Sequence, residues 1–163
     1  MPIFFRLISE YFWAVALAFS VFNYWKADHS GAMKAVAPDK VSEARIYLRN
    51  FAAAGALPWV IMGAGQVTGA TPTVWHYFRP QDGNVFVLAW LAAVFALSST
   101  FAWWVFLANG AKTVVEYNLL AAVGQSGAKP PTERVVKLFA ALGVFIFPIW
   151  VYGVFSMNAP IPR

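Results

Sequence analysis

The chain has 163 residues, of which 60% are hydrophobic and 12% are charged, with a net charge of +5 and no cysteine. Soluble domains carry about 25% charged residues, and a small chain has too much surface to hide so apolar a composition in its own core. The composition therefore excludes an ordinary soluble domain. The absence of cysteine excludes disulfides, thiolate catalysis and cysteine-based attachment of metal or haem.

The first predicted membrane span covers residues 3–25. Its charge-free part, residues 11–25, is slightly shorter than the roughly 20 apolar residues that a crossing needs, so residues 3–10 are included in it. Arg6 and Glu10 are four residues apart and can pair on one helix face at headgroup depth. We expect a retained helix and not a cleaved signal peptide, because the weak cleavage pattern at 16–18 lies inside the apolar run.

The next segment, residues 26–50, is the most polar part of the chain and is predicted to be a basic loop. Residues 28–31 are typical of a turn, and Asp39 after Pro38 is a candidate N-cap. Apolar residues then recur at helical spacing opposite charged ones, which predicts an amphipathic helix along the membrane surface ahead of the second span.

The second predicted span covers residues 51–69, with Pro58 expected to kink it. Gly65 and Gly69 have the GxxxG spacing that lets another helix approach closely. The loop that follows, residues 70–84, contains two prolines and a cluster of aromatic residues. We expect it to cover the helix ends, either lying at the interface or folding back into the bilayer.

The third predicted span, residues 85–111, has no charged residue and exceeds the length that a crossing needs. Its small residues Ala89, Ala93 and Ala96 are expected to pack against the glycines of the second span, with bulky residues such as Trp90 facing away. Helical structure is expected to continue past Lys112 to about residue 120, before a linker at 124–131.

The fourth predicted span covers residues 135–155, with Thr132 as the cap of its helix and a tail at 157–163 that forms no regular structure. The expected fold is therefore all-α, a single transmembrane domain formed by a bundle of four membrane-spanning helices.

Lys and Arg residues predict the orientation of the four spans, because cytoplasmic loops carry an excess of them. The loops at 26–50 and 112–134, with the adjoining start of the fourth span, hold nine, and the two ends of the chain and the 70–84 loop hold three. Both basic loops are accordingly expected in the cytoplasm, and both termini outside. The bacterial inner membrane is the expected location. The nine are Lys26, Lys34, Lys40, Arg45, Arg49, Lys112, Lys129, Arg134 and Lys137.

Candidate chemistry within the spans is limited to polar uncharged side chains, since no charged residue falls at the centre of any span. This pattern counts against a proton-driven pump made of one chain. Ser98, Ser99, Thr100 and Gln66 could face a pore or bind a polar ligand. The alternative is that they bond to helix carbonyls or to a neighbouring helix.

Outside the spans, His76 is the best candidate for ligation or acid–base chemistry, with Arg79 and Asp82 close in sequence. A single-histidine pigment or haem site is one reading, and an interfacial histidine among aromatic residues is the other. His29 is expected on the opposite side of the membrane, so we do not expect one chain to provide two histidines to one haem. We expect no metal site and no cofactor.

The leading functional hypothesis is a non-catalytic accessory or scaffold subunit of a larger membrane complex. It rests on the absence of buried charge, the small-residue helix faces and the aromatic loop. The alternatives are a small homo-oligomeric channel or transporter and, third, a pigment-binding or enzyme subunit that uses His76. The expected partners are membrane lipids and other membrane subunits or further copies of the chain. Nucleic acid is not an expected partner.

Overall fold

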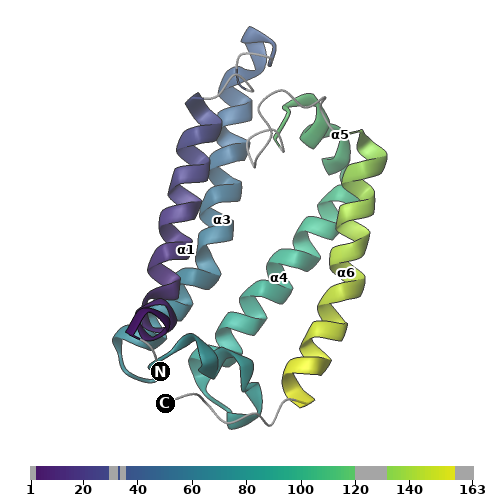
Figure 1. Ribbon diagram of the computed structural model, residues 1–163. Helices are drawn as coiled ribbons and strands as arrows, with labels where there is room; N and C mark the ends of the chain where they lie inside the picture. Colours follow the sequence, from purple (N-terminus) through teal and green to yellow (C-terminus); the bar gives the residue numbers. More distant parts are fainter. Residues whose placement is uncertain (1–2, 30–32, 34–35, 120–131, 157–163) are drawn as a thin grey trace.

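The computed structural model describes residues 3–29, 33, 36–119 and 132–156. All regular structure in these ranges is helical. The long helices are α1 (Ile3–His29), α3 (Val41–Val67), α4 (Val85–Leu107) and α6 (Glu133–Ser156), which run alongside one another (Figure 1). The short elements are the 3₁₀ turns η1 (Pro38–Lys40), η2 (Val74–Phe78) and η3 (Pro80–Asp82), and the helix α5 (Gly110–Glu116).

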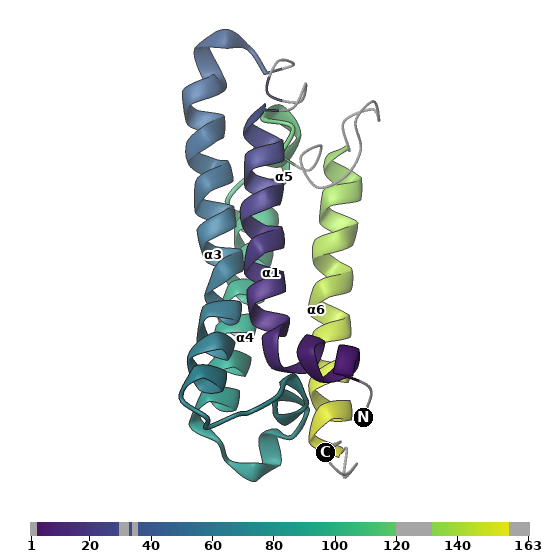
Figure 2. The same ribbon diagram turned by 60° about the vertical axis from the view of Figure 1, so that its left-hand side comes forward.

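The long helices form an open row in which each packs mainly on its neighbour in the sequence. α1 packs on α3, α3 on α4, and α4 on α6, while α5 joins α4 and α6 at one end. Figures 1 and 2 show the 70–84 segment at the opposite end of the molecule from α5. The all-helical prediction is confirmed, but the closed packing of a four-helix bundle is not.

Three of these helices, α1, α4 and α6, are long and apolar enough to cross a membrane, which identifies the chain as a membrane protein. α3 has the length but is more polar, because Glu43, Arg45 and Arg49 lie in its first three turns. The four predicted spans thus correspond to three strongly apolar helices and one mixed helix.

α1 begins at Ile3, as predicted, but differs from the predicted span in its middle and at its C-terminal end. It is kinked at Tyr11, whose backbone angles are φ −115° and ψ 17°, and it continues to His29. Asp28 and His29 are therefore helical and do not begin the predicted turn, and the His29 ring nitrogen Nδ1 lies 2.9 Å from the Trp25 carbonyl. The predicted pair of Arg6 and Glu10 is present, at 3.2 Å.

α3 is continuous from Val41 to Val67, so the prediction of a separate surface helix before the second span is wrong. The apolar face of its first turns is covered by protein: Ala44 and Leu48 are buried in one core cluster with Ala27 of α1 and Val114 of α5. Asp39 lies within η1 and is not the N-cap of α3, which is Lys40. Pro58 lies inside the helix, which does not end there.

α4 ends at Leu107, four residues before the predicted end of the third span. Asn109 has φ 59°, a left-handed conformation that breaks the helix, and α5 then begins at Gly110. Gly110 packs directly on the Trp104 ring, and a Cβ atom at this position would collide with it. The chain therefore turns at 108–110 where the sequence suggests a continuous helix.

α6 covers the predicted fourth span, and Thr132 caps it by accepting a hydrogen bond from the Val135 amide at 3.4 Å, as predicted. The predicted linker at 124–131 and the tail at 157–163 lie outside the described residues.

Candidate functional site

A groove between α3 and α4 contains two of the four polar residues that the sequence marked as pore candidates. We call it the Ser98 groove. Its volume is about 640 Å³. Its polar side chains are Ser98 and Thr100 of α4 and Asn50 and Tyr47 of α3. The remaining wall is mainly aromatic and aliphatic, including Phe51, Phe101 and Trp104. The groove can accept an apolar molecule that carries a hydrogen-bonding group.

Gln66 and Ser99 do not belong to this groove. Ser99 lies on an exposed face of α4. Gln66 lies near the end of α3, where its side-chain Nε2 donates a hydrogen bond to the Ser9 carbonyl at 3.2 Å. Its Oε1 is buried and has no partner among the described residues. The four pore candidates therefore do not line one common surface.

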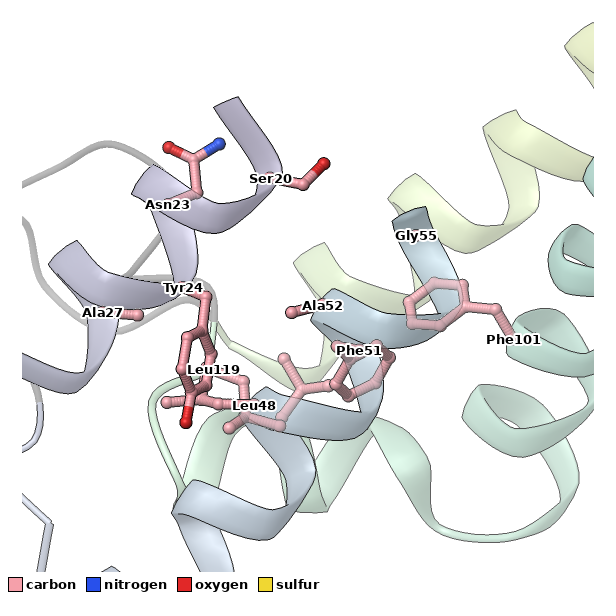
Figure 3. A pocket seen from close by; sticks show the side chains of 11 residues that line it. Ser20, Asn23, Tyr24, Ala27, Leu48, Phe51, Ala52, Gly55, Phe101 and Leu119 are labelled. Atoms are coloured by element: carbon pink, nitrogen blue, oxygen red, sulfur yellow. The ribbon is translucent and has the colours of Figure 1, made fainter. Parts of the chain in front are cut away.

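A second cavity of about 250 Å³ lies between α1 and α3 (Figure 3). Phe51, Gly55 and Phe101 line both this cavity and the Ser98 groove, so the two share a wall. Ser20, Asn23 and Tyr24 supply its polar groups, but the Ser20 hydroxyl already donates to the Ala16 carbonyl at 3.0 Å. The cavity is otherwise apolar.

The small-residue face of α4 is turned away from α3, which reverses the sequence prediction. Ala89 and Ala96 are exposed and Ala93 is half-buried, whereas Trp90 is buried. Trp90 packs edge-on against Tyr77 and Trp150, with ring centroids 5.6 and 5.8 Å apart. Burying this large ring determines the rotation of the helix.

Gly63 of α3 faces Trp13 of α1, and Gly65 faces the 70–84 segment and Phe86 of α4, so neither meets the alanines of α4. A Cβ atom on Gly65 would lie 2.5 Å from both Thr71 Oγ1 and Tyr77 Oη. Gly69 lies beyond the end of α3 in a left-handed conformation, with φ 74°. The two residues of the predicted GxxxG pair therefore do not share a helix face.

His76 lies in η2, Arg79 between η2 and η3, and Asp82 in η3, and the three side chains do not converge on one point. The His76 Nδ1 atom lies 3.2 Å from Thr73 Oγ1 and 3.1 Å from the Thr73 carbonyl, closing a local capping arrangement. Arg79 Nη2 donates to Asp82 Oδ1 at 3.1 Å. Among the described residues no hydrogen bond or ion pair joins the His76 ring to either of the other two.

Tyr77 links the 70–84 segment to α3, and it was not identified as a candidate residue from the sequence. Its side chain is 1% exposed. The hydroxyl donates to the Met62 carbonyl of α3 at 3.2 Å and lies 3.1 Å from Thr71 Oγ1. Burial raises the pKa of Tyr77, so the hydroxyl stays protonated and can donate. Only its position within an aromatic run hinted at this role.

Two ion pairs at the other end of the molecule link α3 to α1 and η1 to α5. Arg45 Nε lies 2.7 Å from Asp28 Oδ1, and Lys40 forms an ion pair with Glu116. The Lys40–Glu116 hydrogen bond and attraction raise the pKa of Lys40 and lower that of Glu116. These partners are 17 and 76 residues apart in the sequence, so no local pattern could predict them.

In the part of the chain that the structure describes, no three His, Asp or Glu side chains lie close enough together to hold a metal ion. No protein-family model matches the chain, and neither a characterised protein nor a solved structure shows significant similarity to it.

Proposed function

We propose that the chain is a non-catalytic accessory or scaffold subunit of a larger membrane complex. The observation that carries this proposal is the outward face of α4, where Ala89, Ala92, Ala96 and Ser99 are exposed. Small side chains allow the backbones of two helices to approach closely, which is how helices associate in membranes where no hydrophobic driving force acts between them. Within this chain, nothing in the described residues covers that face.

The open row of helices supports the same proposal. Only 6% to 11% of the most apolar stretches of α1, α4 and α6 is buried inside the chain. A row whose helices contact mainly their sequence neighbours leaves both of its faces available to lipid or to helices of another subunit.

In the proposed membrane arrangement, α3 is the fourth crossing. It lies between α1 and α4 and packs on both. With four crossings, the excess of Lys and Arg in the loops before α3 and after α4 places these loops in the cytoplasm, and both termini and the 70–84 segment outside. The bacterial inner membrane is the location we propose.

Extraction of the protein from native membranes in mild detergent, followed by mass spectrometry, tests the proposal. We expect a partner subunit in fixed stoichiometry. Ala96→Trp should release it, because the bulky ring blocks close helix approach, whereas Ile146→Trp on the exposed side of α6 should not. A protein that is monomeric and without a partner in native membranes would overturn the proposal.

The second candidate function is a channel or transporter formed by several copies of the chain. The observation in its favour is that Asn50, Ser98 and Thr100 line the same groove. Reconstitution into liposomes tests it, since a pathway through this groove predicts solute flux that Ser98→Val changes. Equal leakage from liposomes with and without protein would exclude this function.

A further inference from the structure

The kink at Tyr11 separates an N-terminal helical segment, residues 3–10, from the rest of α1. This segment is seen almost end-on in Figure 1 and from the side in Figure 2, where it runs across the direction of the long helices. The rest of α1, residues 12–29, is about 27 Å long at 1.5 Å per residue. Of this length, the charge-free residues 12–25 account for about 21 Å of the roughly 30 Å hydrocarbon core, and Lys26 and Asp28 lie in the last turns.

The kink lies level with the end of α3. Gln66, one residue before the last residue of α3, donates from its side chain to the Ser9 carbonyl. A straight α1 would therefore project residues 3–10 about 12 Å past the end of α3. The turn at Tyr11 instead keeps the segment at the level where the helices end.

Residues 3–10 are amphipathic at helical spacing. At about 100° per residue, Arg6, Ser9 and Glu10 fall on one narrow arc. Ser9 is buried against the protein, and Arg6 pairs with Glu10 at 3.2 Å. The opposite, wider arc consists of large apolar side chains that are 40% to 78% exposed. These are Ile3, Phe4, Phe5, Leu7 and Ile8.

We propose that residues 3–10 form an interfacial helix that lies in the plane of the membrane, with its apolar arc inserted at the boundary between headgroups and acyl chains. The occupant of this exposed face is lipid, because the segment continues directly from a helix that crosses the membrane and lies at the level of the helix ends. The proposal does not depend on the accessory-subunit function.

The charge pattern specifies how the segment binds lipid. Arg6 and Glu10 neutralise each other, so the side chains of residues 3–10 carry no net charge. Binding therefore comes from buried apolar area and not from attraction to anionic headgroups. An interfacial helix with unpaired basic residues would instead bind mainly by attraction to anionic headgroups.

The natural absence of cysteine allows a direct test with single spin labels. Phe4→Cys, Arg6→Cys, Leu7→Cys and Ile8→Cys are each labelled and reconstituted in phosphatidylcholine vesicles, with Phe145→Cys on the exposed face of α6 as the deep reference and Ser42→Cys as the aqueous one. Accessibility to oxygen reports lipid contact, and accessibility to a soluble nickel chelate reports water contact.

The proposal predicts high oxygen accessibility at positions 4, 7 and 8, each at a similar shallow depth, and high nickel accessibility at position 6. A depth that increases steadily from position 4 to position 8 would show a straight crossing helix and would overturn it. Equally high accessibility to the nickel chelate at all four positions would show that the segment lies in water, and this would overturn the proposal as well.

A second series in vesicles containing phosphatidylglycerol separates apolar insertion from charge recognition. We expect the same depths in both lipid mixtures. Labels that enter the membrane only when anionic lipid is present would contradict the assignment of apolar insertion.

Discussion

The Tyr117 hydroxyl lies next to the carboxylate of Glu43, which brings the end of α5 against the first turn of α3. The Tyr117 ring also stacks on Tyr47, with centroids 5.4 Å apart and the ring planes inclined by 29°. With the Lys40–Glu116 ion pair, these contacts hold α5 against α3. These contacts hold in place the helix that follows the turn after α4.

The hydrogen bond to Glu43 is the main factor that raises the pKa of Tyr117, to about 12, and burial adds to it. Because the folded-state pKa lies above the unfolded value of about 10, the stabilising contribution is fully present below pH 10. It is lost as the pH rises through about 12. A pH titration followed by tyrosinate absorbance should show the ionisation of Tyr117 at about pH 12. Because the pKa of Tyr77 is raised as well, Tyr117→Phe should remove one tyrosine's share of the late absorbance change, and Glu43→Gln should move that share to lower pH. An unchanged late absorbance change in Tyr117→Phe would assign it to other tyrosines.

The Arg45–Asp28 ion pair is predicted to contribute little to stability, although its atoms are only 2.7 Å apart. The Arg45 side chain is 56% exposed, so water screens the interaction. A double-mutant cycle with Arg45→Ala and Asp28→Ala should give a coupling energy of about 1 kcal/mol or less, decreasing with added salt. Arg49→Ala is the control, because Arg49 is exposed on the same helix and has no ion-pair partner among the described residues. A coupling of about 3 kcal/mol that salt leaves unchanged would indicate a desolvated pair.

The sequence predicts the helical segments well, because apolar runs and capping residues are local signals. The Arg6–Glu10 pair and the Thr132 cap were predicted and are present. The breaks at Tyr11 and Asn109 were not predicted. Tyr11 carries no glycine or proline signal, and the turn at Asn109 depends on the contact between Gly110 and Trp104.

The rotation of α4 and the groups at the candidate sites could not be predicted, because each depends on partners distant in sequence. Trp90 is buried by Tyr77 and by Trp150 from another helix. Ser98 shares its groove with Asn50 of α3, whereas Gln66 bonds to Ser9 of α1. A small-residue stripe identifies a helix face but not whether that face packs within the chain or outside it.

Gly65→Ala is predicted to destabilise the protein. The new methyl group would meet Thr71 Oγ1 and Tyr77 Oη at 2.5 Å and Phe86 Cβ at 3.0 Å, so the 70–84 segment must move away from α3. Overpacking of this kind costs about 1–3 kcal/mol, measurable as a lower unfolding midpoint in mixed detergent. Gly143→Ala in α6 is the matched control, since a Cβ atom there meets nothing within 4 Å. Equal midpoints for both variants would contradict the close packing at Gly65.

Tyr77→Phe is predicted to loosen the 70–84 segment while leaving the helices intact. The variant keeps the aromatic packing on Trp90 but removes the hydroxyl that donates to the Met62 carbonyl and contacts Thr71 Oγ1. Loss of one buried hydrogen bond costs about 1 kcal/mol, and an unsatisfied Thr71 hydroxyl adds to that. The same change at the exposed Tyr152 should alter stability by about 0.5 kcal/mol or less. Hydrogen exchange should quicken at the amides of 71–83 in Tyr77→Phe and not in Tyr152→Phe. Unchanged exchange in both variants would show that aromatic packing alone holds the segment on α3.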